Sequence, residues 1–215
     1  MTNLNLLWMG ALGLGVVAMA WTEPVLKLRG DRFKPLAYEQ LTPQQKTMID
    51  HLLAGDRGGS TEGPFNVFLR SPEMGDAAQQ LGAQIRFHSS LPRRLNEMAI
   101  LITGRHWGAQ YEWYAHHRNA VQAGLSEAII EAIGNGKRPA NLQPDEETVY
   151  NFCHEMLTNR QVSDATYQAA VSKFGERGAV DLVGVMGYYT LVSMALNLDR
   201  YPLPEGAKAE LKPLK

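Results

Sequence analysis

From residue 42 onward the sequence repeats one pattern: proline or serine where an apolar stripe of helical period begins, and glycine where the stripe ends. The clearest stripe follows Pro92, where Leu95, Met98, Ala99 and Ile102 recur at i, i+3, i+4 and i+7. No alternation of apolar and polar residues is long enough for a strand. The sequence therefore predicts an all-α protein. The expected helices cover about residues 42–55, 71–88, 92–104, 108–123, 126–134, 145–159, a stretch that begins at 163, and 179–198.

The composition is that of a globular protein. Its 215 residues are 45% hydrophobic and 20% charged, which excludes a disordered, collagen-like or coiled-coil chain. The 21 Lys and Arg against 22 Asp and Glu leave a net charge of −1, without a long basic run, so we expect no nucleic-acid partner. The single cysteine, Cys153, excludes an intramolecular disulfide and a Cys-x-x-Cys pair, and its apolar stripe predicts an inert core residue.

The first residues form a separate, uncharged segment. Residues 4–21 carry no charge, and Ala18-Met19-Ala20 has the small-x-small form of a signal-peptide cleavage site. A cleaved leader implies an exported protein, periplasmic or secreted. An uncleaved one implies a membrane anchor, with membrane contact through residues 4–21, and a buried helix is the third alternative. The expected organisation is a leader over 1–20, a linker over 21–41, one helical domain over 42–204 and a polar tail over 205–215.

Three ionisable residues lie on apolar helix faces. Glu97 shares a face with Ile100 and Leu101, and Glu112 lies one turn before His116 on the apolar face of the next helix. Burial raises the pKa of a carboxyl, and a neighbouring carboxylate stabilises an imidazolium, so such a group favours proton transfer near neutral pH. Glu97, Glu112 and His116 are therefore the candidate catalytic residues. The alternatives are a core histidine and an ordinary intrahelical ion pair.

Candidate substrate-binding residues lie close by in the sequence. Arg105 is a possible clamp for a carboxylate, and the aromatic side chains of Trp107, Tyr111 and Trp113 are a possible ligand platform. The alternative for Arg105 is an exposed helix residue, and for the aromatic residues it is core or a subunit interface. The histidines show no spacing typical of a metal site, so we expect no metal.

The stretch 94–124, RLNEMAILITGRHWGAQYEWYAHHRNAVQAG, resembles the core motif of the carboxymuconolactone decarboxylase family, which includes alkyl hydroperoxidase D. Residues 180–204 resemble the end of the same domain, and the resemblance extends over 38–204. Glu97 and His116 match the Glu and the His of the hydroperoxidase motif. The two cysteine positions of that motif hold Ala109 and Glu112, and Cys153 matches neither.

The resemblance implies an alkyl hydroperoxidase D-like helical fold in a single domain, with subunits assembled into trimers or hexamers and active sites near subunit contacts. It also implies one of two chemistries, thiol peroxidation or decarboxylation of an unsaturated carboxy-lactone. Without the cysteine pair the peroxidase cycle has no nucleophile. We therefore expect a cofactor-free acid–base lyase that acts on such a lactone or a related small carboxylate. The alternatives are a peroxidase-like antioxidant protein and a non-catalytic, oligomeric binding protein.

The last predicted helix also indicates self-association. Residues 179–198 are apolar nearly all round, and one small helical domain does not easily cover such a helix on every side. Gly184 and Gly187 permit another helix to approach closely. We therefore expect a homo-oligomer, a homotrimer or a homohexamer.

Overall fold

The computed structural model describes residues 23–213, and the leader expected over residues 1–20 lies outside the described residues. The expected all-α class is confirmed: the described residues form eight α-helices and one short 3-10 helix, with no strand among them. In chain order the elements are η1 (Tyr38–Gln40), α1 (Pro43–Ala54), α2 (Phe65–Phe68), α3 (Pro72–Phe87), α4 (Arg93–His106), α5 (Gln110–Gln122), α6 (Glu127–Gly134), α7 (Pro144–Asn159) and α8 (Asp164–Asp199).

Local sequence explains where the helices begin. At the start of α1 the Thr42 side chain accepts a hydrogen bond from the Gln45 backbone N–H, and the Gln45 side chain accepts one from the Thr42 backbone N–H. Pro43 occupies the first position of this helix, where no backbone N–H is needed. The boundaries predicted from proline, serine and glycine therefore agree with the structure to within a few residues.

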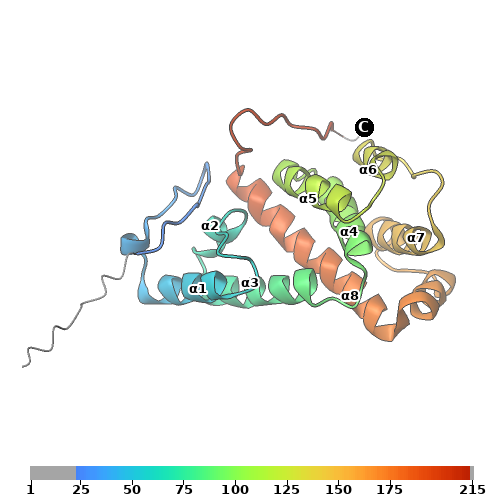
Figure 1. The fold of residues 1–215 in the computed structure, drawn as a ribbon, viewed down its shortest axis with the longest axis horizontal. Helices are drawn as coiled ribbons and strands as arrows, with labels where there is room; N and C mark the ends of the chain where they lie inside the picture. The colour runs from blue at the N-terminus through green and yellow to red at the C-terminus, as the bar shows by residue number, and fades with distance from the viewer. Residues whose placement is uncertain (1–22, 214–215) are drawn as a thin grey trace, which may run out of the picture.

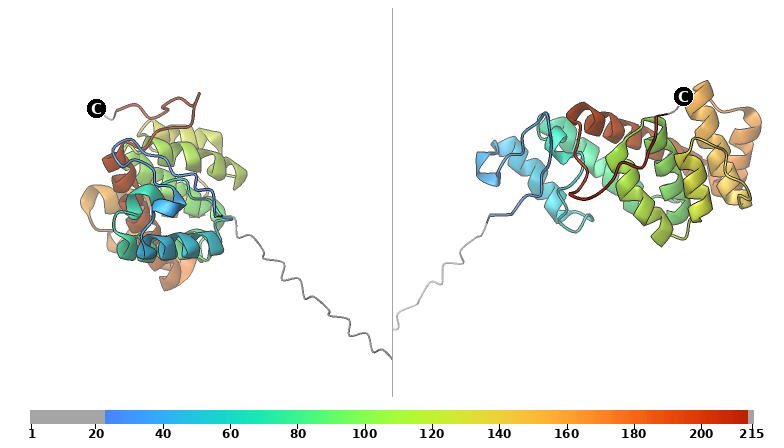
Figure 2. Two further views of the ribbon diagram at one scale, coloured as in Figure 1. Left: turned by 90° about the vertical axis from the view of Figure 1, so that its left-hand side faces the viewer. Right: turned by 90° about the horizontal axis from the view of Figure 1, so that it is seen from above.

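Helix α8 is the central element of the fold. In Figure 1 it runs diagonally through the molecule, with α1, α2 and α3 on one side and α4 to α7 on the other. Figure 2 shows an elongated body, with α1 near one end and the first turns of α8 near the other. Leu182, Val185, Tyr189, Val192 and Leu196 of α8 are buried in the core, so this helix joins the two groups of helices.

A backbone break divides α8 into two parts. Gly175 has φ 71° and ψ 172°, a conformation that only glycine adopts readily. The sequence predicts two helices here, but it puts the start of the second at residue 179, after the observed break.

Among the described residues, α8 alone is long and apolar enough to span a membrane. Buried core helices of other proteins also meet this criterion, and 56% of the most apolar window of α8 is buried inside the protein.

The segments on either side of the helical domain pack against it. In the expected linker, the backbone N–H of Phe33 donates to the carboxylate of Asp199 at 2.7 Å. In the expected tail, Leu211 is buried, and its backbone carbonyl accepts a hydrogen bond from the Gln110 side chain at 2.7 Å. Neither segment has a regular apolar period, so these contacts could not be predicted from the sequence.

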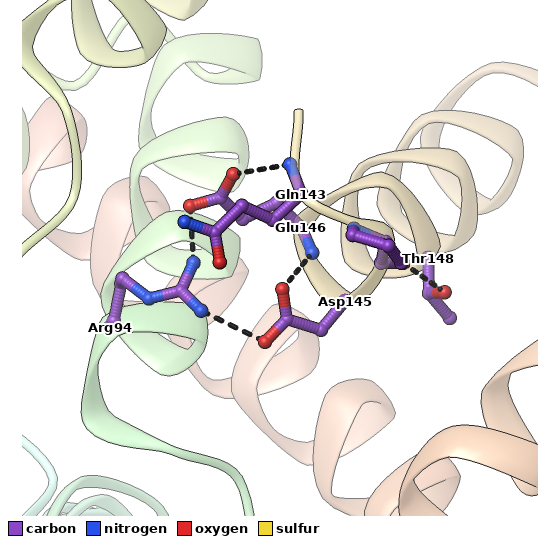
Figure 3. A network of polar contacts seen from close by, with 6 residues as sticks. Arg94, Gln143, Asp145, Glu146 and Thr148 are labelled. Carbon is purple, nitrogen blue, oxygen red and sulfur yellow. Dashed lines mark hydrogen bonds and ion pairs between the residues drawn. The ribbon is translucent and has the colours of Figure 1, made fainter. Parts of the chain in front are cut away.

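A network of charged side chains fixes α4 to the start of α7 (Figure 3). Arg94 donates to Asp145 at 2.8 Å, and its other terminal nitrogen donates to Glu146. Glu146 also accepts a hydrogen bond from the backbone N–H of Gln143 at 2.8 Å and so caps α7. Both carboxylates lie in the first turn of α7, where the helix dipole favours negative charge.

Replacing Arg94 by methionine is expected to lower the free energy of unfolding by about 2–4 kcal/mol, because the buried Glu146 carboxylate loses its partner. Denaturant unfolding measures the change. Arg138→Gln is the matched control, since the pair of Arg138 with Glu147 is about half exposed and its loss is expected to cost no more than about 1 kcal/mol. Equal losses in the two variants would contradict this role of Arg94.

Candidate active site

The three candidate catalytic residues come together between α4 and α5. The Glu97 carboxylate lies 2.6 Å from Nδ1 of His116, and the Glu112 carboxylate lies 3.3 Å from Nε2 of the same ring. All three residues are at most 4% exposed. Glu112 and His116 are neighbours because residues i and i+4 share a helix face, whereas Glu97 reaches the imidazole from the adjacent helix. We refer to Glu97, His116 and Glu112 as the triad.

The two carboxylates of the triad differ in their bonding. Glu97 forms a short contact with His116, of the length expected when a carboxylate accepts a hydrogen bond from a ring N–H. Glu112 Oε2 is buried without a hydrogen-bond partner, although it lies within ion-pair distance of the ring. Burial raises the pKa of the Glu112 carboxyl, while the nearby His116 and Arg86 act in the opposite direction. Glu112 is therefore the triad carboxyl suited to carry a proton.

Two tyrosines of α8 complete the surroundings of the triad. The Tyr189 ring meets the His116 ring edge-on, with centroids 4.9 Å apart and an interplanar angle of 83°. Burial holds the pKa of Tyr189 well above its usual range, so its hydroxyl stays protonated. The Tyr188 hydroxyl accepts a hydrogen bond from the Arg57 guanidinium at 3.2 Å. These contacts restrict the imidazole plane and position one arginine next to the triad.

The triad borders a cavity of about 380 Å³. His116 and Glu112 line its wall, and three arginines from different elements surround it: Arg57 from the loop after α1, Arg86 from α3 and Arg118 from α5. None of these arginines forms an ion pair with a carboxylate within residues 23–213. Glu62 also lines the cavity, but its carboxylate is paired with Arg29 at 3.1 Å. The cavity therefore joins a buried proton-transfer group to a wall in which the three arginines outnumber the carboxylates, and such a wall favours an anionic ligand.

Glu97 faces a different hollow. It lines a space of about 320 Å³ together with Ser89, Arg93 and Asn96, and Arg86 lines both this hollow and the triad cavity. The Glu97–His116 contact therefore lies between two accessible spaces, with the imidazole on one side and the carboxylate on the other.

The structure separates the predicted substrate-binding residues. Tyr111 lines the triad cavity, with its ring 4.5 Å from that of Tyr201. Arg105 and Trp107 line another hollow, near Leu211. Trp113 is buried and donates its indole N–H to a carboxylate of the C-terminal segment, and it does not line the cavity. Of the four candidates, only Tyr111 accompanies the triad.

Sequence reasoning missed the cationic wall. Arg57 follows the end of a helix, Arg86 is near the end of another, and Arg118 lies on an exposed position of α5. Nothing in their spacing along the chain connects them. The one sequence feature that connects an arginine with the triad is that Arg118 and His116 lie on the same helix. This feature does not indicate that Arg57 and Arg86 line the same cavity.

Cys153 is part of the core, as expected. It is fully buried in α7, and burial raises the pKa of its thiol to about 12, so the reactive thiolate form is suppressed. No group of three or more His, Cys, Asp or Glu side chains arranged to hold a metal ion occurs within residues 23–213.

A scan against protein-family models and a search of curated protein sequences found no match to this chain.

The raised pKa of Glu112 predicts a pH-dependent difference between the wild type and Glu112→Gln. Because the folded state favours the protonated carboxyl, the stability that this residue contributes is present at low pH. It is lost as pH rises from the ordinary carboxyl range through the raised pKa. Glutamine stays neutral, so Glu112→Gln is expected to gain stability relative to the wild type from pH 4 to pH 8. Melting temperatures across this range test it, and a constant difference would contradict the raised pKa.

Proposed function

We propose that this protein is a cofactor-free acid–base lyase that removes carbon dioxide from a small unsaturated carboxylate, such as a carboxy-lactone. The observation that carries the proposal is the buried Glu97–His116–Glu112 triad at the edge of a cavity with three arginines. We further propose that the chain belongs with the carboxymuconolactone decarboxylase-like proteins of alkyl hydroperoxidase D-like fold. Support for that relationship comes from the all-helical architecture and from the resemblance over residues 94–124.

The first step is binding of the anionic substrate. Carboxylate oxygens accept hydrogen bonds from guanidinium groups, and a buried site strengthens these charge-assisted bonds. Arg57 is half-buried and held by the Tyr188 hydroxyl, so it offers a fixed donor. Arg86 is also half-buried and lines the cavity beside Glu112. One arginine binds the carboxylate and the other stabilises the oxygen on which charge develops.

The second step is loss of carbon dioxide and return of a proton. The bond between the substrate carbon and its carboxylate breaks, and its electron pair spreads through the conjugated system to the carbonyl oxygen, which gives an enolate. Glu112, whose pKa burial raises, supplies the proton to the carbon, and His116 passes a replacement proton to Glu112. Glu97 orients the imidazole and borders the second hollow, through which protons exchange with solvent.

A peroxidase is the less favoured alternative. The positions of its two cysteines hold Ala109 and Glu112, both buried, and the thiol of Cys153 is buried with a raised pKa. A dithiol cycle needs an accessible thiolate and a second thiol to resolve it. A non-catalytic binding protein also fits a cationic cavity, but it would not need a buried carboxyl of raised pKa next to an imidazole.

A substrate screen tests the proposed activity. The purified protein is incubated with unsaturated carboxy-lactones and with their analogues that lack the carboxylate, and carbon dioxide release is measured. Release is expected only from carboxylated compounds, and Glu112→Gln should abolish most of it. Binding of these compounds without release by the wild type would favour the binding-protein alternative. Reduction of an organic hydroperoxide that depends on Cys153 would favour the peroxidase.

We also propose that the protein is a homo-oligomer. Val180, Val183, Met194 and Leu198 of α8 are each about half exposed or more, and an added Cβ at Gly187 would meet no atom within 4 Å. An apolar helix face that is open to solvent in one chain is typical of a contact surface. Light scattering at micromolar concentration should give the mass of three or six chains, and Val183→Glu should lower it. A monomer in the wild type would contradict the proposal.

A further inference from the structure

Arg105 is a buried cation without a described partner. It lies in the last turn of α4 and is 6% exposed, yet its guanidinium takes part in no hydrogen bond or ion pair within residues 23–213, and its Nε is buried and unsatisfied. Arg94, at the other end of the same helix, binds two carboxylates of α7 (Figure 3). Within residues 23–213, α4 therefore carries one arginine that pairs with carboxylates and one that pairs with none.

Such an arrangement is costly unless something binds to it. A buried charged group without a partner destabilises a folded protein, and the partial negative charge at a helix C-terminus offsets only part of that cost. Burial alone lowers the pKa of Arg105, with no carboxylate acting in the opposite direction. A position selected only for stability would hold a methionine or leucine here.

Arg105 lines a hollow of about 200 Å³ between α4, α7 and the end of α6. His106, Lys137 and His154 also line it, and no carboxylate does. The rest of the wall is mostly apolar or aromatic. Its members are Ile102, Ile133, Tyr150 and Leu157. The hollow therefore combines a cationic end with an apolar wall. Its volume is large enough for a small organic acid.

We propose that this hollow is a second ligand site, which binds the carboxylate of a small organic acid at Arg105 and its apolar part against the isoleucines and Leu157. None of its lining residues lines the triad cavity, so the site is separate from the proposed active site. Lys137 is exposed at the rim and adds attraction for the anion. The inference does not depend on the proposed decarboxylation.

Benzoate, a small carboxylate with an apolar ring, is the probe. In a titration followed by NMR of the histidine side chains, the signals of His106 and His154 are expected to shift and saturate. Arg105→Gln should weaken binding by about 10- to 100-fold, the effect of losing charge-assisted hydrogen bonds. Arg118→Gln, the same substitution at the triad cavity, should leave the response at these two histidines unchanged.

Three results would overturn the proposal: no saturable shift of His106 and His154, an unchanged response in Arg105→Gln, or a response confined to His116. Inorganic phosphate, which lacks an apolar part, is expected to bind more weakly than benzoate, and equal affinity would exclude the role of the apolar wall. If Arg105→Gln does not fold, Lys137→Gln replaces it, because an exposed rim residue can change without disturbing the core.

A stability measurement separates a ligand-binding role from a structural one. If Arg105 is kept for a ligand, Arg105→Met without benzoate is expected to have an unchanged or higher melting temperature, since an unpartnered charge is removed. Benzoate should then raise the melting temperature of the wild type and not that of the variant. A marked fall in the melting temperature of Arg105→Met would show that the side chain supports the fold instead.

Discussion

Replacing His116 by asparagine is expected to lower kcat by about 10²–10⁴, with the fold and assembly unchanged. Asparagine can keep a contact with the Glu97 carboxylate but cannot pass a proton to Glu112. Glu112→Gln is expected to have an effect of similar size, because glutamine cannot supply the proton. Steady-state kinetics on the best lactone of the screen measures both. The double variant should lose little more than either single one, since the two residues act as a unit.

Cys153→Ala is the control for this prediction. Its thiol is buried in α7 and lines neither the triad cavity nor the hollow next to Glu97, so turnover is expected to change by less than about twofold. The opposite pattern would contradict the acid–base assignment. If Cys153→Ala is inactive and His116→Asn stays within about threefold of the wild type, a thiol carries the chemistry.

The second large effect is expected at the arginines. Arg57→Gln and Arg86→Gln should each lower kcat/KM for a carboxylated substrate by about 10- to 100-fold, because each removes charge-assisted hydrogen bonds to an anion. Arg118 is exposed at the edge of the cavity, so Arg118→Gln should have a smaller effect. Kinetics with each variant separates the contributions to KM and kcat.

A lysine substitution is the matched control for the arginines. Arg86→Lys keeps the charge but loses the planar pair of donors, so we expect its kcat/KM to lie between those of the wild type and Arg86→Gln. Equal activity of wild type and Arg86→Gln on carboxylated substrates would show that this side chain does not bind the anion. The substrate class would then have to be reconsidered.

Much of the fold follows from local sequence. Pro43, Pro72 and Pro92 mark helix starts, and the apolar stripe from Leu95 onward marks the helix that the structure buries most completely. These features are local, because helix caps and helical periodicity depend on residues a few positions apart. The break in α8 was less accurately predicted, since the sequence does not reveal which glycine adopts a positive φ. Gly175 adopts it, four residues before the expected start at 179.

The triad was more predictable than the cavity around it. Glu112 and His116 are four residues apart on one helix, and the apolar neighbours of Glu97 indicated that its carboxyl is buried. The arginines come from separate elements, and their meeting depends on tertiary packing that no short spacing encodes. Arg105 shows the reverse error. Arg105 is close to Glu97 and Glu112 in the chain, so the sequence analysis associates it with the active site. In the structure it lines two other hollows and not the triad cavity.

The most direct measurement uses an unsaturated lactone labelled with ¹³C in its carboxylate, turned over in D₂O. If the triad removes carbon dioxide and returns a proton, the wild type should release one labelled carbon dioxide per product molecule and leave one deuterium on the carbon that carried the carboxylate. His116→Asn should do both more slowly by about 10²–10⁴. Absence of labelled carbon dioxide from every lactone that binds, or release at the wild-type rate by His116→Asn, would contradict the proposed acid–base lyase.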